Sequence, residues 1–190
     1  MPTEEKKPEI IVFAGPNGSG KSTITKLARI IDPYINADDI KRTTHCSDMD
    51  AAIKAEELRE AALSEQSDFT FETVLSTERN LNLLKRAREQ GYFIRCIYVL
   101  TVNPEINEIR VLARESHGGH GVPPEKIRLR YDKCLKLLPE LVGLCDVMHI
   151  YDNSKEPFRI FKKRKTEYFY WENEFWSKTR IKELTGIKLN

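Results

Sequence analysis

Short apolar runs alternate along this chain with longer stretches in which apolar residues recur every three or four positions. The short runs predict strands at Glu9–Ala14, around Tyr34–Asn36, and at Phe69–Phe71, Phe93–Val102 and Val147–Tyr151. The longer stretches predict helices at Ser22–Ile31, Ser47–Ser64 and Glu78–Gln90, one that begins after the Asn103-Pro104 pair, and one from Pro124 through Leu137. Strands that alternate with helices are typical of a parallel sheet covered on both faces. We therefore expect an α/β fold of three layers with a parallel sheet of about five strands.

A glycine-rich segment separates the last two predicted helices. It runs Ser116-His117-Gly118-Gly119-His120-Gly121-Val122-Pro123, and so much glycine between two charged helices is typical of a mobile lid. The helix before it carries Arg110 and Arg114 four residues apart, which places both on one face. The helix after it carries Arg128 and Arg130. The expected fold thus includes a helical, arginine-rich lid.

Length and composition fit one globular domain over residues 1–190. The formal charge of +2 implies no general attraction to nucleic acid. No apolar run approaches the roughly 20 residues that span a bilayer, and Met1–Lys7 lacks the apolar centre of a signal peptide. Four cysteines are scattered without a C-x-x-C pair, which predicts neither a disulfide framework nor a zinc site. We expect a cytoplasmic protein with no membrane partner.

The last part of the chain, residues 155–190, differs in character from the rest. The basic run Phe161–Lys165 is followed by the aromatic run Tyr168–Trp171 and by Phe175 and Trp176. Basic and aromatic residues together occur where proteins hold single-stranded nucleic acid, but short charge runs are usually solvated. We favour the second interpretation, an edge strand or hairpin and a final helix that packs aromatic residues on the domain. Nucleic acid is therefore not an expected partner.

The segment after the first predicted strand matches the phosphate-loop pattern G-x-x-x-x-G-K-[ST] at every fixed position. Glycines let such a loop curl until its backbone N–H groups point at an anion, and the following helix adds the positive end of its dipole. We expect Lys21 to reach the β- and γ-phosphates of a nucleoside triphosphate and Ser22 to ligate Mg²⁺. A glycine-rich turn that binds nothing is the alternative. The predicted nucleotide-binding residues are Gly15, Pro16, Asn17, Gly18, Ser19, Gly20, Lys21, Ser22 and Thr23.

Acidic residues after a later strand favour a kinase among the many classes of protein that use a phosphate loop. Asp38 and Asp39 follow the second predicted strand, where the loop projects from the carboxyl edge of the sheet toward bound phosphates. A carboxylate there can accept the proton of a hydroxyl group. We assign that role to Asp38 and give Asp39 the role of a helix cap or a support. The alternative is that one or both only cap the next helix.

Glu72 lies at the end of the third predicted strand, where an unpaired carboxylate would be costly. It could bind substrate hydroxyls or amides, or sit behind a Mg²⁺-bound water. We favour substrate binding, with pairing to a structural arginine as the alternative. Further expected substrate contacts are Thr73, Thr77 and the lid residue His120. Asn153 follows the last strand and is expected near the adenine, although a plain turn fits those residues equally well.

Arginine side chains that close over a γ-phosphate stabilise the charge of phosphoryl transfer. Arg110, Arg114 and Arg130 are the candidates for this role, each with a solvated surface charge as its alternative, and Arg128 is the least promising. The predicted catalytic set consists of Lys21, Asp38, Arg110, Arg114 and Arg130.

Five segments follow one another in a recognisable order: G-P-N-G-S-G-K-S-T, I-N-A-D-D-I, F-E-T-V-L-S-T, G-G-H-G-V-P with I-R-L-R-Y, and Y-D-N-S. From about residue 9 to residue 154 the chain resembles the zeta-toxin family of phosphate-loop kinases, with 155–190 as an extension. The resemblance implies an adenylate-kinase-like sheet and ATP-dependent phosphorylation of a sugar hydroxyl. UDP-N-acetylglucosamine is the substrate of the founding members.

The resemblance also carries roles onto single residues. It matches Asp38 to the general base, Glu72 to the substrate-binding carboxylate and Lys21 to the phosphate-loop lysine. It matches Arg110, Arg114 and Arg130 only loosely to the lid arginines. In the founding toxins a helical region before the phosphate loop receives an antitoxin protein, whereas residues 1–8 alone precede the first strand here. An antitoxin is thus an implied partner for which that mode of docking is not expected.

We therefore expect a kinase that transfers the γ-phosphoryl group of ATP to a hydroxyl of a small molecule such as a nucleotide sugar. One alternative is an NTP-dependent switch or ATPase, against which stand the missing N-K-x-D and D-x-x-G motifs. A nucleic-acid end kinase is the other alternative, and it depends on the basic and aromatic tail.

Overall fold

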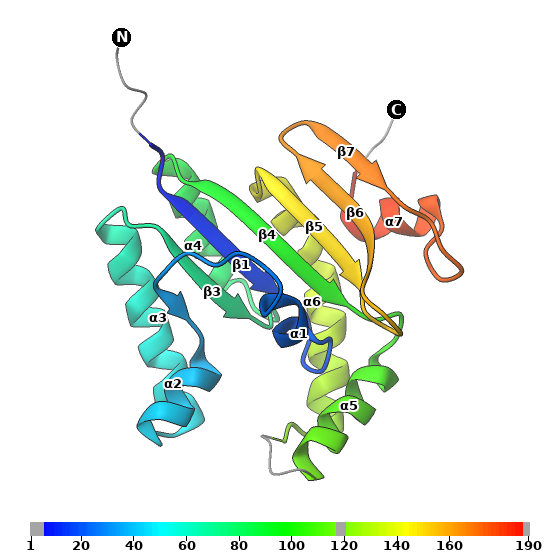
Figure 1. The fold of residues 1–190 in the computed structure, drawn as a ribbon, viewed down its shortest axis with the longest axis horizontal. Helices are drawn as coiled ribbons and strands as arrows, with labels where there is room; N and C mark the ends of the chain where they lie inside the picture. The colour runs from blue at the N-terminus through cyan, green and yellow to red at the C-terminus, as the bar shows by residue number, and fades with distance from the viewer. Residues whose placement is uncertain (1–5, 117–120, 188–190) are drawn as a thin grey trace.

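A seven-stranded sheet forms the centre of the molecule in a computed structural model that describes residues 6–116 and 121–187 (Figure 1). The strands are β1 (Glu9–Ala14), β2 (Tyr34–Ile35), β3 (Phe69–Thr73), β4 (Phe93–Leu100), β5 (Val147–Asp152), β6 (Phe158–Arg164) and β7 (Glu167–Tyr170). Their order across the sheet is β2-β3-β1-β4-β5-β6-β7. Pairing is parallel from β2 to β5 and antiparallel between β5, β6 and β7. The expected α/β class is confirmed, and an antiparallel hairpin extends the five parallel strands.

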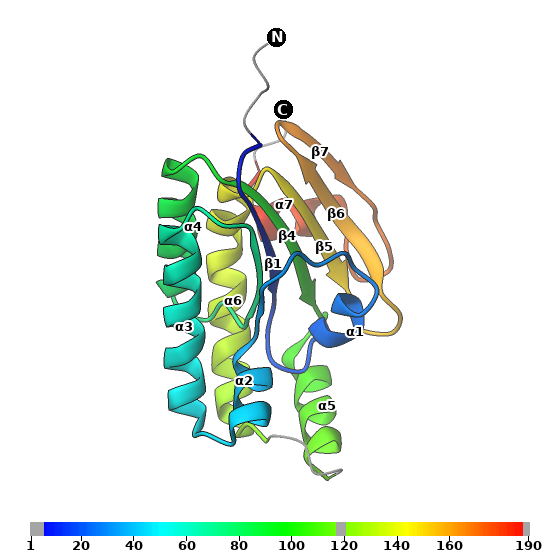
Figure 2. The same cartoon turned by 60° about the vertical axis from the view of Figure 1, so that its left-hand side comes forward.

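Helices cover the two faces of the sheet unequally. They are α1 (Lys21–Thr25), α2 (Ala37–Thr44), α3 (Asp48–Ser64), α4 (Arg79–Glu89), α5 (Pro104–Ser116), α6 (Pro124–Leu144) and α7 (Lys178–Thr185). Helices α3, α4 and α6 lie side by side on one face, and the short α1 lies on the other (Figure 2). Helix α7 packs against α6. No helix within the described ranges is long and apolar enough to cross a membrane.

The main hydrophobic core lies between the sheet and α3, α4 and α6. Alternate residues of each strand point to this side, as the period of two in a strand requires. Strand β1 is nevertheless buried on both sides from its second residue onward, because it is central and its other side is covered by α1 and the chain that follows. Large side chains at the centre of this core include Phe69, Phe71, Leu81, Leu84, Tyr98 and Leu138.

Helix α1 is shorter than the expected Ser22–Ile31. It ends at Thr25, so that Leu27 and Ile30 are exposed although they fit the helical pattern. The chain leaves the helix because Ile31 pairs with the sheet: its N–H donates to the Thr70 hydroxyl (2.8 Å), which in turn donates to the Ile31 carbonyl (2.7 Å). The helical pattern of the sequence does not reveal this contact, because Thr70 lies far from Ile31 along the chain.

Two other helices differ from the sequence-based boundaries. Helix α6 continues through Pro139 to Leu144, beyond the expected end at Leu137. The sequence predicts α2 only as a helix that Asp38 or Asp39 caps. Its cap is Asn36, whose side chain accepts a hydrogen bond from the Asp38 N–H (2.9 Å).

The tail forms the hairpin and final helix that the sequence favoured. Strands β6 and β7 make the hairpin, and Trp176 is buried in the core beside α7. The basic run alternates in direction along β6. Lys163 is buried on the helix side, where its Nζ donates to the carbonyls of Val142 (2.7 Å) and Gly143 (3.3 Å) near the end of α6. A cation at a helix C-terminus is electrostatically favoured.

The core predicts a large difference between two identical substitutions. Leu84→Ala in α4 removes a fully buried side chain and is expected to lower the free energy of unfolding by about 2–5 kcal/mol. Leu27→Ala, at a side chain that is 84 % exposed, is expected to change it by less than about 0.5 kcal/mol. Urea unfolding followed by circular dichroism measures both. A large loss at Leu27 would show that α1 extends as the pattern alone predicts.

Candidate active site

A cleft of about 720 Å³ opens at the carboxyl ends of β1 and β3. The phosphate loop and the first turn of α1 form one wall, and α2 and α3 form another. Helix α6, the chain just before it and Arg114 of α5 complete the cleft. The charged residues that line it are Lys21, Asp38, Asp48, Arg59, Glu72, Arg114, Lys126 and Arg130. Acidic and basic groups therefore face one another across a single cavity.

The phosphate loop has the curled backbone that its glycines predict. Gly18 and Gly20 have φ angles of 75° and 91°, in the left-handed region that favours glycine. A Cβ atom on Gly20 would lie 2.1 Å from the side-chain nitrogen of Asn153, and one on Gly15 would lie 2.0 Å from the Val99 carbonyl oxygen. The loop thus packs directly against the ends of β4 and β5. Glycine is required here both for conformation and for space.

Lys21 is buried beneath the loop and is held by backbone oxygens. Its Nζ donates to the carbonyls of Gly15 (2.9 Å) and Pro16 (3.2 Å) and lies 3.9 Å from Oε1 of Glu72. Carbonyl contacts of this kind are easily exchanged for phosphate oxygens, which carry full charge. The side chain is therefore directed at the cleft.

Glu72 is fixed by a short chain of hydrogen bonds. Its Oε2 accepts from the Tyr34 hydroxyl (3.0 Å), which itself accepts from Nδ2 of Asn36 (3.2 Å). Burial and the nearby Glu72 carboxylate raise the pKa of Tyr34, so this phenol remains protonated and continues to donate. The contacts leave Oε1 beside Lys21. The partners of Glu72 are thus a lysine and a tyrosine, in place of the structural arginine that was its alternative.

Asp38 and Asp39 point to different surroundings although they are adjacent. Asp38 is exposed and lines the cleft. Asp39 forms an ion pair with Arg42 one turn later (2.7 Å) and is absent from the cleft wall. Asn36 rather than either carboxylate caps α2. This division fits Asp38 as the base, and it makes the cap role for Asp39 wrong.

The three candidate arginines separate in space. Arg114 lines the cleft, and so does Arg130, whose Nη1 donates to Oδ1 of Asn17 (3.2 Å). Arg110 lies on α5 one turn before Arg114 and donates from Nη2 to the Ser154 carbonyl (3.2 Å), outside the cleft wall. Arg128 pairs with Glu108 and Glu105 and so ties α6 to α5. His120, the expected lid contact, lies outside the described residues.

The remaining expected contacts are divided between the cleft and the scaffold. Thr73 lines the cleft, but its Oγ1 also accepts from Asn80 (2.7 Å) and from the Leu75 N–H (3.0 Å). Thr77 is exposed and does not line the cleft. Asn153 donates from Nδ2 to the Ser19 carbonyl (2.8 Å), so it holds the phosphate loop. A contact between Asn153 and adenine stays a prediction.

Two residues of the cleft wall and one residue behind the phosphate loop carry no motif and were missed by sequence reasoning. Arg59 of α3 and Lys126 of α6 add two cations to the cleft wall. Asn107 of α5 is fully buried; its amide donates to the Asn17 carbonyl (2.7 Å) and its oxygen accepts from the Thr101 hydroxyl. The one sequence signal for Asn107 is its position four residues before Val111, which places a polar residue on the buried side of α5. Nothing local distinguishes Arg59 from the other charges of α3.

The residues present fit a bound triphosphate with Mg²⁺. The cradle at Gly18 and Gly20 has no room for a side chain, and Oγ of Ser19 is buried with no hydrogen-bond partner in the part of the chain that the structure describes. The Ser22 side chain lines the cleft beside Lys21. Buried donors without partners are rare, because each costs free energy unless a ligand or water satisfies it.

Comparisons with known proteins identify a relative in sequence and similar folds among solved structures. No protein-family model matches the chain. An uncharacterized protein of Haemophilus influenzae is 31 % identical over 127 residues, which make up 64 % of this chain and 91 % of the relative.

Two similar solved structures cover most of this chain. One, from the PezAT chromosomal toxin-antitoxin system of Streptococcus pneumoniae, has a TM-score of 0.59 at 18 % identity and covers 97 % of this chain and 86 % of its own. The other, from the AvrRxo1-ORF1:-ORF2 complex with ATP, has a TM-score of 0.67 at 13 % identity. It covers 88 % of this chain, which spans 61 % of that longer one. At such identities the likeness is one of fold.

The packing of the phosphate loop predicts a specific response to one added methyl group. Gly20→Ala is expected to weaken ATP binding by about 1.4 kcal/mol or more, roughly tenfold in Kd, because Asn153 must move and the loop with it. Gly91→Ala is the control, since its φ of 86° carries the same backbone strain but nothing lies within 4 Å of the new atom. Isothermal titration with ATP compares the two. Equal affinities would show that the loop does not hold the nucleotide.

Proposed function

We propose that this chain transfers the γ-phosphoryl group of ATP to a hydroxyl of a small molecule. The chain belongs to the same family as the Haemophilus influenzae protein. Its fold is that of the zeta-toxin-like phosphate-loop kinases. The observation that carries the proposal is the single cleft in which Lys21, Arg114 and Arg130 face Asp38 and Glu72. Cations suit the transferred phosphoryl group, and a carboxylate suits the hydroxyl that receives it.

The phosphate loop is the evidence that ATP binds at its end of the cleft. Lys21 would release the carbonyls of Gly15 and Pro16 and contact the β- and γ-phosphates. Ser22 would hold Mg²⁺, which when bound neutralises part of the charge on the transferred group. Arg130 approaches the loop from α6 through Asn17, and Arg114 approaches from α5. Cations from two different helices can thus surround the γ-phosphoryl group.

Asp38 and Glu72 are the evidence that the acceptor binds at the other end of the cleft. The acceptor oxygen forms the new bond to phosphorus while the bond between the γ-phosphorus and the β–γ bridging oxygen breaks, and Asp38 takes the hydroxyl proton. Glu72 would bind a second polar group of the acceptor through the carboxylate that Tyr34 orients. Correct placement of the hydroxyl is itself a large part of catalysis in this reaction class.

The acceptor class we propose is the nucleotide sugars. The cleft volume of about 720 Å³ lies within the range of small-molecule sites. Its wall includes the Asn80 amide besides the carboxylates of Asp38 and Glu72, and hydroxyl-rich ligands are bound by such groups. UDP-N-acetylglucosamine is the first compound to test, on the strength of the sequence resemblance.

The proposal includes a compartment and a partner. ATP and reduced thiols both belong to the cytoplasm, where we propose that the chain acts. One similar solved structure comes from a toxin-antitoxin system and another from a two-component complex. We propose on this basis that a second protein restrains this one.

The function is tested by following the label of γ-labelled ATP in the presence of Mg²⁺. The purified protein is incubated with nucleotide sugars, nucleosides and short oligonucleotides, and the products are separated. Label on a nucleotide sugar is the expected result. Label only in free phosphate would favour an NTP-dependent switch or ATPase, and label on an oligonucleotide end would favour a nucleic-acid kinase.

The two adjacent aspartates give a matched pair of variants for the base. Asp38→Asn keeps the size of the side chain and removes its basicity, so acceptor phosphorylation is expected to fall by about 10²- to 10⁴-fold with ATP affinity nearly unchanged. Asp39→Asn breaks an exposed ion pair outside the cleft and is expected to leave turnover within about twofold. Rates of acceptor labelling decide between them. Turnover of Asp38→Asn at the level of the unsubstituted protein would end the assignment of the base.

Two arginines on one helix test transition-state stabilisation. Arg130→Ala removes a cation from the cleft and is expected to lower kcat on the order of 10³-fold. Arg128→Ala removes a cation of the same helix that pairs with Glu108 and Glu105, and it is expected to retain kcat within about threefold. Steady-state kinetics on the identified acceptor, or on ATP turnover, provide the comparison. Equal losses in both variants would point to packing between α5 and α6 as the cause.

A further inference from the structure

The sheet face that points away from α3, α4 and α6 bears no described helix over β5, β6 and β7 (Figure 2). Helix α1 contacts β1 and β4 at one end of this side. We call the exposed remainder, on β4 to β7, the open face. Two of its aromatic side chains, Phe169 and Trp171, are 43 % and 36 % exposed. Exposed apolar groups that gather on one face, in contrast to single scattered ones, mark a candidate binding surface.

The strand register aligns basic and aromatic residues across the open face. Ile97 pairs with His149, His149 pairs with Lys162, and Lys162 pairs with Phe169. Side chains that are directly opposite on paired strands share a face. The row therefore crosses four strands, from an aliphatic residue through an imidazole and an ammonium group to a phenyl ring.

Arg159 joins this row to the second exposed aromatic residue. Its guanidinium lies over the Trp171 ring at 4.3 Å from the centroid, and its Nη1 lies 3.5 Å from Nδ1 of His149. Its Nε is buried and has no hydrogen-bond partner among the residues that the structure describes. Lys162 lies over the Phe169 ring in the same way, at 5.7 Å. Each exposed ring thus has a cation beside it, and one donor of Arg159 is left unsatisfied.

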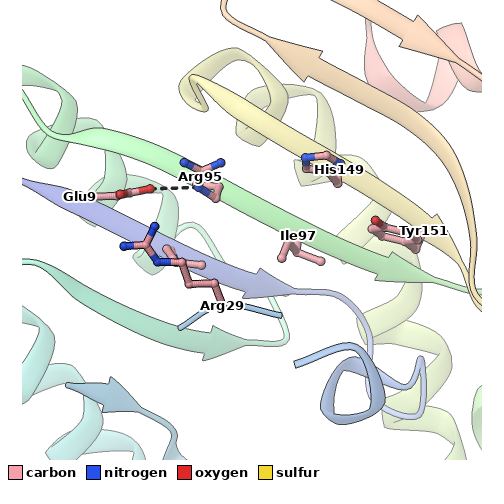
Figure 3. Close-up of a pocket in the computed structure, with 7 residues that line it drawn as sticks. Glu9, Arg29, Arg95, Ile97, His149 and Tyr151 are labelled. Carbon is pink, nitrogen blue, oxygen red and sulfur yellow. Dashed lines mark hydrogen bonds and ion pairs between the residues drawn. The ribbon is translucent and has the colours of Figure 1, made fainter. Parts of the chain in front are cut away.

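A shallow cavity of about 290 Å³ continues the open face toward β1 (Figure 3). His149, Tyr151 and Arg95 line it from the sheet, and Arg29 lines it from the chain after α1. His149 and Tyr151 are stacked, with ring centroids 6.3 Å apart and planes at 17°. None of the lining residues belongs to the active-site cleft. The cavity is thus a separate site with its own aromatic surface and cations.

The net charge of this surface is positive. Its cations are Arg29, Arg95, Arg159, Lys162 and Arg164, and its acids are Glu9, which is paired with Arg95 (2.9 Å), and Glu167, which lies opposite Arg164. Burial and the nearby Arg159, Lys162 and Arg95 lower the pKa of His149 to about 4. The imidazole is therefore neutral at pH 7 and can accept or donate a hydrogen bond. An anionic ligand is the complement of such a surface.

We propose that the open face binds single-stranded nucleic acid, with phosphates on Arg29, Arg95, Arg159 and Lys162 and unpaired bases on Trp171, Phe169 and the ring of Tyr151. Alternation of cations with exposed rings is the composition of single-strand platforms, because phosphates and bases alternate along the ligand. An acidic peptide would use the cations but leave the rings without a partner. The net charge of the chain predicts no attraction to nucleic acid, and this inference reverses that expectation. The reason is that Arg159 and Lys162 of the tail lie on one face together with Arg29 and Arg95, which are distant in the sequence.

The proposal goes beyond the kinase function and does not depend on it. Direct binding is measured by fluorescence anisotropy with labelled uridine and thymidine strands of about 12 nucleotides, and with a duplex of the same length. Four phosphate contacts predict a slope of log K against log salt near −2.8, so that affinity falls about 50-fold from about 50 to about 200 mM salt. Tighter binding of the uridine strand would identify RNA as the ligand, and tighter binding of the thymidine strand would identify DNA.

Two variants locate the binding on the open face. Arg159→Gln with Lys162→Gln is expected to reduce the salt slope to about −1.4, a fall of about sevenfold over the same range. Lys133→Gln with Lys136→Gln makes the same charge change at exposed positions of α6 and is expected to keep the original slope. Binding is also expected to quench the fluorescence of Trp171 and not that of the buried Trp176. Trp171→Leu should therefore abolish the quenching and weaken binding about fivefold or more.

Four outcomes would overturn the proposal. They are no binding of either strand at about 50 mM salt, equal loss in the α6 control pair, binding of duplex as tight as that of single strands, and displacement of the strand by polyglutamate at equal charge concentration. The last result would assign the open face to an acidic protein instead. Circular dichroism and thermal unfolding of each variant confirm that a loss of binding occurs in folded protein.

Discussion

The phosphate loop is packed so closely between the ends of β4 and β5 and the start of α5 that three of its positions have no room for a side chain. Gly15 lies against the backbone of β4, Gly18 against that of Asn107, and Gly20 against the amide of Asn153. Close approach of this kind needs central strands that are rigid and buried on both sides, as β1 is. The geometry of the loop, and of everything directed at it, therefore rests on the packing of the sheet.

The charges in the cleft are held by the same scaffold. Lys21 is anchored by carbonyls of the loop itself, and Glu72 is oriented by Tyr34 from the neighbouring strand β2. Arg130 reaches the loop through Asn17, whose backbone is fixed in turn by the buried Asn107. Lys21 and Glu72 pair only at the long distance of 3.9 Å, and each is oriented by other contacts, so both side chains stay in place at the wall of the cleft before a ligand arrives.

The two faces of the sheet serve different purposes. One face is covered by α3, α4 and α6 and supplies most of the core. On the other face the short α1 contacts β1 and β4, and no described helix covers β5, β6 and β7 (Figure 2). The antiparallel hairpin then extends this accessible surface by two strands. A kinase-like cleft at the strand ends and a cationic, aromatic face can therefore coexist in one small fold without sharing residues.

The sequence by itself determined the α/β class, the five parallel strands and the phosphate loop, because each depends on local pattern: alternation, helical periodicity and glycine spacing. It also singled out the Asp38-Asp39 and Glu72 segments, whose chemistry follows from their place after a strand. Their roles remain predictions.

Tertiary structure decided which members of each local group face the cleft. Arg110 and Arg114 share a helix face in sequence, yet one turn of rise directs Arg110 to the Ser154 carbonyl and leaves Arg114 at the cleft wall. Asp38 and Asp39 diverge in the same way. The alternation of β6 buries Lys163 and exposes Lys162 to distant strands. These outcomes depend on pairing between segments far apart in the chain, which no local pattern encodes.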